Sequence, residues 1–175
     1  MTEATVERVE PEDLQRVRED RMAALAEFVL LQLPNAEVLR LDVEEWRRTG
    51  LRYRVILRSS SESSIAGLTN QADRPVPFGV ALTAELVDGH RCVLGPGRLR
   101  EFGRQSDPVL VLVVDHRQWL VRAGWLSEGR RRDDDAVEVP VDIVDLESET
   151  FVQVVQRGLA TSSGLLPARQ SPESR

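Results

Sequence analysis

The sequence predicts an α+β fold, with a single mixed, mainly antiparallel sheet of about 6–7 strands flanked by an N-terminal and a C-terminal helix. Apolar residues recur at helical spacing near both ends of the chain, and most segments between Leu39 and Ile143 alternate apolar with polar residues. No linker divides the 175 residues into two cores. We therefore expect a flexible N-terminus at 1–10, one domain at 11–159 and a disordered tail at 160–175.

The first helix should begin near Pro11, because proline suits the first turn of a helix. Pro34 and Asn35 should end it. The inward face at helical spacing consists of Met22, Leu25, Ala26, Val29 and Leu33.

Two strands should follow, one over 39–44 and one over 51–58, because both segments alternate with a period of two. The segment 59–74 has no such period and predicts a long loop. Alternation resumes over 76–86 and runs into Asp88-Gly89, a dipeptide typical of type I′ turns. We expect a hairpin there, with the returning strand beginning near His90.

A short helix is expected from Arg98 to Phe102. Residues 109–114 are apolar at every position, which predicts a strand in the middle of a sheet that is covered on both faces. The returning strand should place Trp119, Val121, Ala123 and Trp125 on one face.

The last strand is predicted over 137–143, where Pro140 restricts it to an edge or a bulge because proline donates no ladder hydrogen bond. A closing helix should then bury Phe151, Val152, Val155 and Leu159, with Asp145 or Ser148 as its N-cap and Gly158 weakening its end.

Composition excludes several classes of function. The net charge is −6, which disfavours a protein that coats nucleic acid over its whole surface. The chain has no lysine, so it contains no Schiff-base lysine and no P-loop lysine. A single cysteine, Cys92, precludes an internal disulfide, and no apolar run is long enough for a membrane span. We expect a cytoplasmic protein without a cofactor.

Two groups of residues are candidates for binding. Asp115 and His116 follow the most apolar strand, where α/β sheets commonly bind ligands, although the same DHRQ segment suits an ordinary hairpin turn. Arg98, Arg100 and Arg104 are candidates for a local patch that contacts phosphates through guanidinium groups, although a solvated surface that balances the acidic residues explains them equally simply. Phe102 is the only aromatic residue among these arginines, so a base-stacking surface is not predicted.

The order of the predicted elements, with PVLVLVVD, then a tryptophan, then VEVPVDIVD before a closing helix, resembles the restriction-endonuclease-like fold. The likeness is to an uncharacterised bacterial group within it. The resemblance implies a metal-dependent centre of the form P-D…(D/E)-x-K. Here Glu85 is followed by Leu86 and Val87 with no lysine, and Arg58 stands at the end of the preceding strand. By this comparison the nuclease motif is lost.

We therefore expect a non-catalytic binding or scaffold protein whose partner is a protein, with nucleic acid as a further partner through the arginine patch. One alternative is a divergent nuclease that uses Glu85 and Asp42 with Mg²⁺. Another is an adaptor that contacts proteins only. We expect no metal site outside the nuclease alternative.

Overall fold

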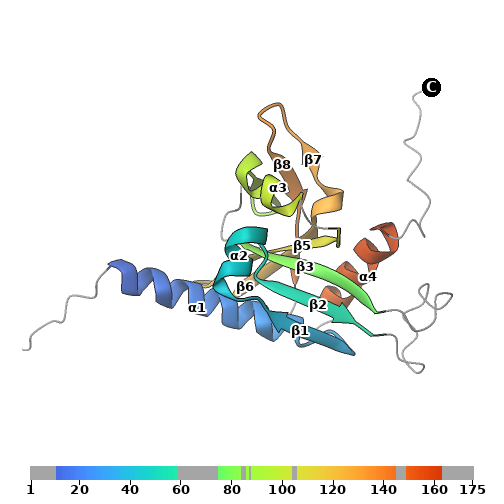
Figure 1. Cartoon of the computed structure of the whole chain (residues 1–175), viewed down its shortest axis with the longest axis horizontal. Coiled ribbons are helices and arrows are strands. Elements are labelled where there is room, and N and C mark those ends of the chain that lie inside the picture. The colour runs from blue at the N-terminus through green and yellow to red at the C-terminus, as the bar shows by residue number, and fades with distance from the viewer. Residues whose placement is uncertain are drawn as a thin grey trace, which may run out of the picture.

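The computed structural model describes residues 11–58, 75–83, 86, 88–103, 106–144 and 149–162. Within these ranges the fold is α+β, as predicted (Figure 1). The α-helices are α1 (Pro11–Leu30), α2 (Val43–Thr49), α3 (Pro96–Phe102) and α4 (Thr150–Ser162). The strands are β1 (Ala36–Arg40), β2 (Tyr53–Leu57), β3 (Val76–Thr83), β4 (Arg91–Leu94), β5 (Val109–Asp115), β6 (Leu120–Trp125), β7 (Arg130–Arg131), β8 (Val137–Pro140) and β9 (Asp142–Val144).

The larger sheet has six strands in the order β1-β2-β3-β5-β6-β9. Only the pairing of β3 with β5 is parallel, so the sheet is mixed and mainly antiparallel. The apolar strand β5 lies between β3 and β6, and its residues 109–114 are all buried. The prediction of a central strand covered on both faces is confirmed.

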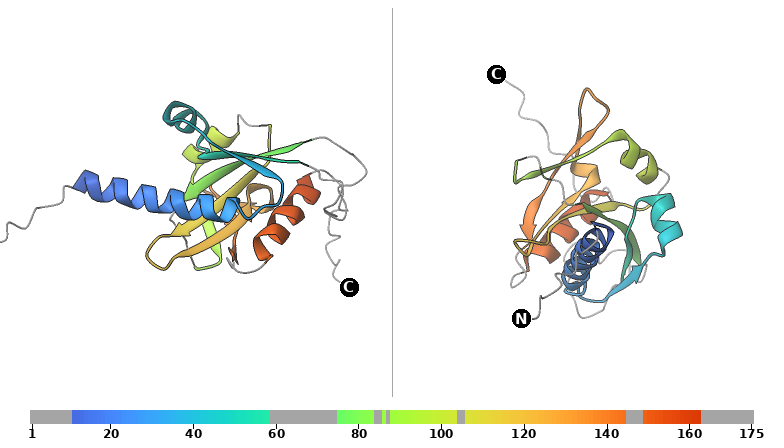
Figure 2. Two further views of the ribbon diagram at one scale, coloured as in Figure 1. Left: turned by 90° about the horizontal axis from the view of Figure 1, so that it is seen from below. Right: turned by 90° about the vertical axis from the view of Figure 1, so that its left-hand side faces the viewer.

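The two faces of β5 belong to two separate cores. Leu110, Leu112 and Val114 pack into the cluster beneath α1 and α4. Val109, Val111 and Val113 pack into a second cluster with residues of α3, β4 and β8. Figure 2 shows the same layering, with α1 and α4 on one side of the large sheet. Burial on both faces explains why this strand lacks the alternation of its neighbours.

A three-stranded sheet of order β4-β8-β7 covers the second face, and the sequence did not predict it. The expected hairpin after Asp88-Gly89 was wrong, because β4 pairs with β8 instead of β3. Gly89 takes a positive φ of 81°, but residues 88–90 form a bend that does not join β3 to β4 in one ladder. The Asp88 carboxylate instead accepts hydrogen bonds from the His90 N–H and the Arg91 side chain.

The predicted strand over 137–143 is divided at Pro140, where β8 ends and the chain crosses to the edge of the large sheet as β9. The N–H of Val141, between the two strands, donates to the His90 carbonyl at 2.8 Å. The crossing passes close over β6, and Gly124 provides the space for it. A Cβ there would collide with the Pro140 carbonyl oxygen.

The closing helix α4 docks on Trp125. The indole Nε1–H donates to the Val154 carbonyl oxygen at 2.8 Å, and the ring meets Phe78 edge-on with centroids 5.4 Å apart. Gly158 lies directly against the indole, so it permits close approach of the helix rather than weakening its end as predicted. Phe151, Val155 and Leu159 are buried and Val152 is partly buried, as expected. The helix runs to Ser162, whereas the tail was predicted to begin at residue 160.

Trp119 does not share the buried face of β6. Val121, Ala123 and Trp125 are fully buried there, as predicted. Trp119 instead lies in the turn before the strand with a φ of 55° and is 67% exposed. A tight turn reverses the side-chain direction that simple alternation would give, so this part of the prediction was wrong.

Helix α1 anchors the N-terminal part of the chain. Leu25, Ala26, Val29 and Leu33 are buried against the sheet, which confirms the predicted inward face. Tyr53 on β2 fixes its position, because the phenol hydrogen bonds to the Ala23 carbonyl and to the Glu27 carboxylate at 3.1 Å each. No helix in the described part of the chain is both long and apolar enough to cross a bilayer.

Tyr53 should titrate far above the normal range for tyrosine. Burial raises the pKa of its phenol, and the Glu27 carboxylate raises it further. The neutral Tyr53 phenol therefore contributes fully to folding stability below about pH 10, its pKa in the unfolded chain. This contribution is lost as pH rises from there through the pKa in the folded protein. Tyr53 is the only tyrosine, so tyrosinate absorbance reports on this residue alone. We expect a midpoint near 10 in denaturant and a much higher one in the native protein; equal midpoints would contradict burial.

Candidate functional site

Asp42, one of the two predicted metal ligands, is the N-cap of α2. Its Oδ1 accepts a hydrogen bond from the Glu45 N–H at 2.8 Å, and Gly50 ends the helix with a left-handed φ of 70°. The strand predicted over 39–44 therefore ends earlier, because Asp42 favours the cap position and Val43 begins the helix. Glu85, the other predicted ligand, lies outside the described residues. No group of three or more acidic, histidine or cysteine side chains suited to a metal occurs in the part that the structure describes.

Asp115 and His116 occupy the hairpin turn between β5 and β6. The Asp115 carboxylate accepts hydrogen bonds from the N–H groups of Arg117 and Gln118 at 2.9 and 3.1 Å. The bond from Gln118, and then that from Arg117, hold the pKa of Asp115 below its usual range. Asp115 therefore stabilises the turn, which supports the hairpin interpretation of DHRQ.

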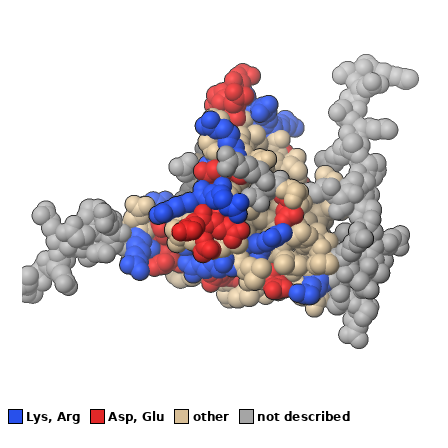
Figure 3. Space-filling view, in the orientation of Figure 1, with Lys and Arg blue, Asp and Glu red and all other residues tan. Residues whose placement is uncertain are grey.

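The predicted arginine patch is only partly described, because Arg104 lies outside the described residues. Arg98 donates to the Leu82 carbonyl at 3.1 Å, pairs with Glu101 at 3.5 Å and lies over the Phe102 ring. These contacts tie α3 to β3 and leave Arg98 half-buried. Arg100, on the same short helix, is exposed. Basic and acidic side chains are interspersed on the face in Figure 3, so this view shows no large area of one sign.

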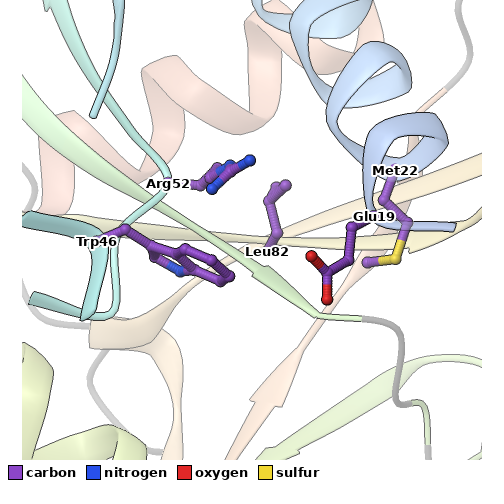
Figure 4. A pocket seen from close by; sticks show the side chains of 5 residues that line it. All are labelled: Glu19, Met22, Trp46, Arg52 and Leu82. Atoms are coloured by element: carbon purple, nitrogen blue, oxygen red, sulfur yellow. The ribbon is translucent and has the colours of Figure 1, made fainter. Parts of the chain in front are cut away.

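A small open pocket lies where α1 leaves the sheet (Figure 4). It is lined by Glu19, Met22, Trp46, Arg52 and Leu82. The Arg52 guanidinium stacks on the Trp46 ring, 4.6 Å from its centroid, and Glu19 lies across the opening. The pocket offers an aromatic surface, an apolar floor and one carboxylate, which suit contact with a side chain of a partner.

The sequence interpretation missed this pocket because it treated residues 45–50 as a connection between two strands. A helix signal was present. Asp42 is followed by Glu45 at the third helical position, and Gly50 follows the last helical residue. Recognising that signal would have placed Trp46 on a helix facing the sheet.

Four of the eight large hydrophobic side chains that are exposed in the described part lie on the solvent-facing side of α1 or directly after it, and we term this side the outer face. Its large apolar side chains are Leu14, Val17, Phe28 and Leu31, with exposed fractions of 59%, 46%, 55% and 72%. Arg21 and Ala24, also exposed, continue the row. Leu31 follows α1 directly, and its N–H donates to the Glu27 carbonyl at 2.9 Å, so the helical hydrogen bonding reaches it.

The outer face follows helical geometry. The six positions are separated alternately by three and four residues, which places them in one stripe along the helix. At 100° per residue, the centre of this stripe lies almost opposite Ala23, Ala26 and Leu30, which are buried on the same helix. The outer face is thus not an extension of the core.

The N-terminal half of α1 also extends beyond the body of the protein (Figures 1 and 2). Every side chain from 14 to 20 is exposed. An isolated helix of this length is marginal in water, and tertiary packing usually supplies its stability. A surface that packs against this half would stabilise it.

The sequence contains a signal for the outer face, namely the second apolar set at spacing of three and four. The sequence interpretation assigned only the core-facing set.

Comparison with known protein families finds no family model that matches this chain, and comparison with curated proteins finds no match.

Proposed function

We propose that this chain is a non-catalytic binding or scaffold protein that binds another protein through the outer face of α1. One observation carries the proposal: four large apolar side chains are exposed in a single helical stripe. Scattered exposed apolar residues are common on soluble proteins, whereas a contiguous apolar patch typically marks an interaction site. Helical stripes of this kind bind the grooves or helices of partner proteins.

The same proposal treats the chain as a nuclease-like framework whose catalytic motif is lost. Two observations support this part. The chain has no lysine to orient water or stabilise charge, and Asp42 is used as a helix cap. The engagement of Arg98 with Leu82 and Glu101 favours a protein partner over nucleic acid, because that guanidinium already has acceptors.

A matched pair of variants tests the proposal. The full chain is immobilised and the proteins it retains from its source cells are compared for wild type, Phe28→Glu and Val43→Glu. Val43 is 50% exposed, close to the 55% of Phe28, but it lies on α2. A charge on the outer face must be desolvated on binding, so Phe28→Glu should reduce the retained partner at least ~10-fold. Val43→Glu should retain it fully.

Salt distinguishes the type of partner. Phosphate contacts weaken steeply as salt rises, whereas an apolar protein interface does not. We expect retention to persist in about 1 M NaCl, where charges are screened over only ~3 Å. Equal retention by wild type and Phe28→Glu, or release by salt alone, would contradict binding through the outer face.

A further inference from the structure

We propose that the outer face of α1 binds the same face of a second copy of this chain, with the two helices antiparallel. This inference rests on the proposed function, because it names the partner of that surface. It is carried by the arrangement of the exposed residues, by the area they offer and by the extended half of the helix.

The exposed row is symmetric about its midpoint, which lies between Met22 and Ala23. When two copies of α1 run antiparallel about that midpoint, the row meets itself position by position. Three kinds of layer then form across the interface, each present twice: Leu14 with Leu31, Val17 with Phe28, and Arg21 with Ala24. A two-fold interface must be self-complementary in this way, because every contact between two positions occurs twice, once from each copy.

The layers also fit by size. Val17 is small where Phe28 is large, and Ala24 leaves room for the aliphatic stem of Arg21 while its guanidinium reaches the solvated edge. Both ends of the row are closed by leucines. A parallel pair would instead place Phe28 against Phe28 and the two Arg21 side chains against each other, which repel.

The available area reaches the lower limit for a specific interface. The four large side chains expose roughly 450 Å² per chain, if about 200 Å² is taken for each fully exposed side chain. Two copies therefore offer about 900 Å², and the stem of Arg21 with Ala24 brings the total near the ~1,000 Å² that specific interfaces require. We expect a reversible dimer rather than an obligate one.

The antiparallel arrangement also supports the exposed half of α1. Leu14 and Val17 are in the half that extends into solvent, whereas Phe28 and Leu31 are where the helix lies on its own sheet. In the antiparallel pair each extended half packs beside the part of the partner's helix that is anchored to a folded core. Both extended halves thereby gain tertiary contacts.

Charges at the sides of the row do not drive this association. Asp20 and Glu27 lie along one side and Arg18 along the other, and a two-fold axis brings each side against its own copy. The acidic side therefore meets the partner's acidic side, and these like charges oppose association at low salt. Glu27 is already engaged by Tyr53 and Arg40 of its own chain. The apolar layers must therefore supply the affinity, and raising the salt concentration should leave the dimer intact or strengthen it.

The first test is the molar mass of the full chain by sedimentation from nanomolar to submillimolar concentration. Wild type and Val43→Glu should pass from monomer to dimer over the same range. Phe28→Glu introduces two charges into each dimer and should raise the dissociation constant at least ~100-fold. Phe28 is 55% exposed, so this variant should retain its fold, which circular dichroism checks. A monomer at every concentration, or a dimer unaffected by Phe28→Glu, would overturn the proposal.

The second test measures helix direction. Cys92 is fully buried, so cysteines introduced on the outer face should be the ones that oxidise. Val17→Cys and Phe28→Cys are prepared as separate single variants and then mixed under mild oxidation. The antiparallel pairing predicts a disulfide-linked dimer in the mixture and little in either variant alone. Linkage of each variant to itself would indicate a parallel pair and overturn the proposal.

Failure of this inference and failure of the proposed function give different results. A chain that stays monomeric, but whose retained partner is lost in Phe28→Glu, excludes the second copy and leaves the outer face as a binding surface for another protein. If Phe28→Glu keeps both the dimer and the retained partner, the dimer inference and the proposed function are both excluded.

Discussion

Replacing Trp125 by alanine should lower the free energy of unfolding by about 4 kcal/mol, one of the largest effects expected for any single substitution in this protein. The indole is fully buried, contacts Phe78 edge-on and donates its Nε1–H to the Val154 carbonyl. The substitution opens a cavity between the sheet and α4 and removes the hydrogen bond that positions the helix. Urea denaturation monitored by far-ultraviolet circular dichroism measures the loss.

Trp125→Phe is the matched variant, because it keeps an aromatic ring but removes the indole N–H. We expect the lost hydrogen bond to α4 to lower the free energy of unfolding by about 1–2 kcal/mol, in addition to the smaller contact area of the phenyl ring. Its total cost should still be smaller than that of alanine. If alanine were tolerated as well as phenylalanine, α4 would not be docked on this side chain.

Gly124→Ala should destabilise the protein by about 3 kcal/mol, the second large effect. A Cβ at this position would overlap the Pro140 carbonyl oxygen and press on Val141. The obstructing atom belongs to the backbone where the chain crosses from one sheet to the other, so it cannot move away like a flexible side chain. The crossing itself would have to shift, and the β6–β9 pairing with it. Thermal and urea denaturation both measure this change.

Gly97→Ala provides the control for the same chemical change. Gly97 lies in the first turn of α3, and a Cβ there would meet no atom within 4 Å. Alanine favours helix over glycine by roughly 0.5–1 kcal/mol, so this variant should be neutral or slightly more stable. Equal losses in Gly124→Ala and Gly97→Ala would show that the close approach of Pro140 to β6 does not exist.

The sequence predicted those parts of the fold in which local pattern and tertiary role agree. β5 is apolar at each of 109–114 because it is buried on both faces, whereas a strand with one solvated face would alternate apolar with polar residues. The inward faces of α1 and α4 were also predictable, because helical spacing places one set of residues against the sheet. The turn at Asp115 followed from residue preferences alone.

The partner of each strand was not predictable in the same way. Alternation predicts β8 as a strand, and β4 was expected as the returning strand of a hairpin, but neither signal shows that the two pair with each other across a long separation in sequence. The strand predicted over 137–143 divides at Pro140 because the chain crosses β6 at Gly124. The close approach of these two residues cannot be inferred from the sequence around either one. α2 was missed because Val43 continued the alternation of the preceding segment and residues 45–50 were treated as a connection, whereas the caps at Asp42 and Gly50 indicate a helix.

The candidate site was predicted least well, for a related physical reason. A helix with apolar residues on two opposite sides has weak overall amphipathicity, so its second stripe is easily missed once the first accounts for the core. Only the packing of α1 shows that Phe28 and Leu31 point to solvent while Val29 and Leu33 are buried. Conversely, Arg98 looks available in the sequence but is held by Leu82 and Glu101.

Whether this protein binds or cleaves is tested most directly by incubating the purified full chain with DNA and with RNA in the presence of Mg²⁺ or Mn²⁺. We predict no cleavage above that of buffer at any metal concentration. Asp42→Asn, which retains an N-cap side chain, should also behave like wild type in stability. Metal-dependent cleavage by the wild-type chain that disappears in Glu85→Ala would contradict a non-catalytic role.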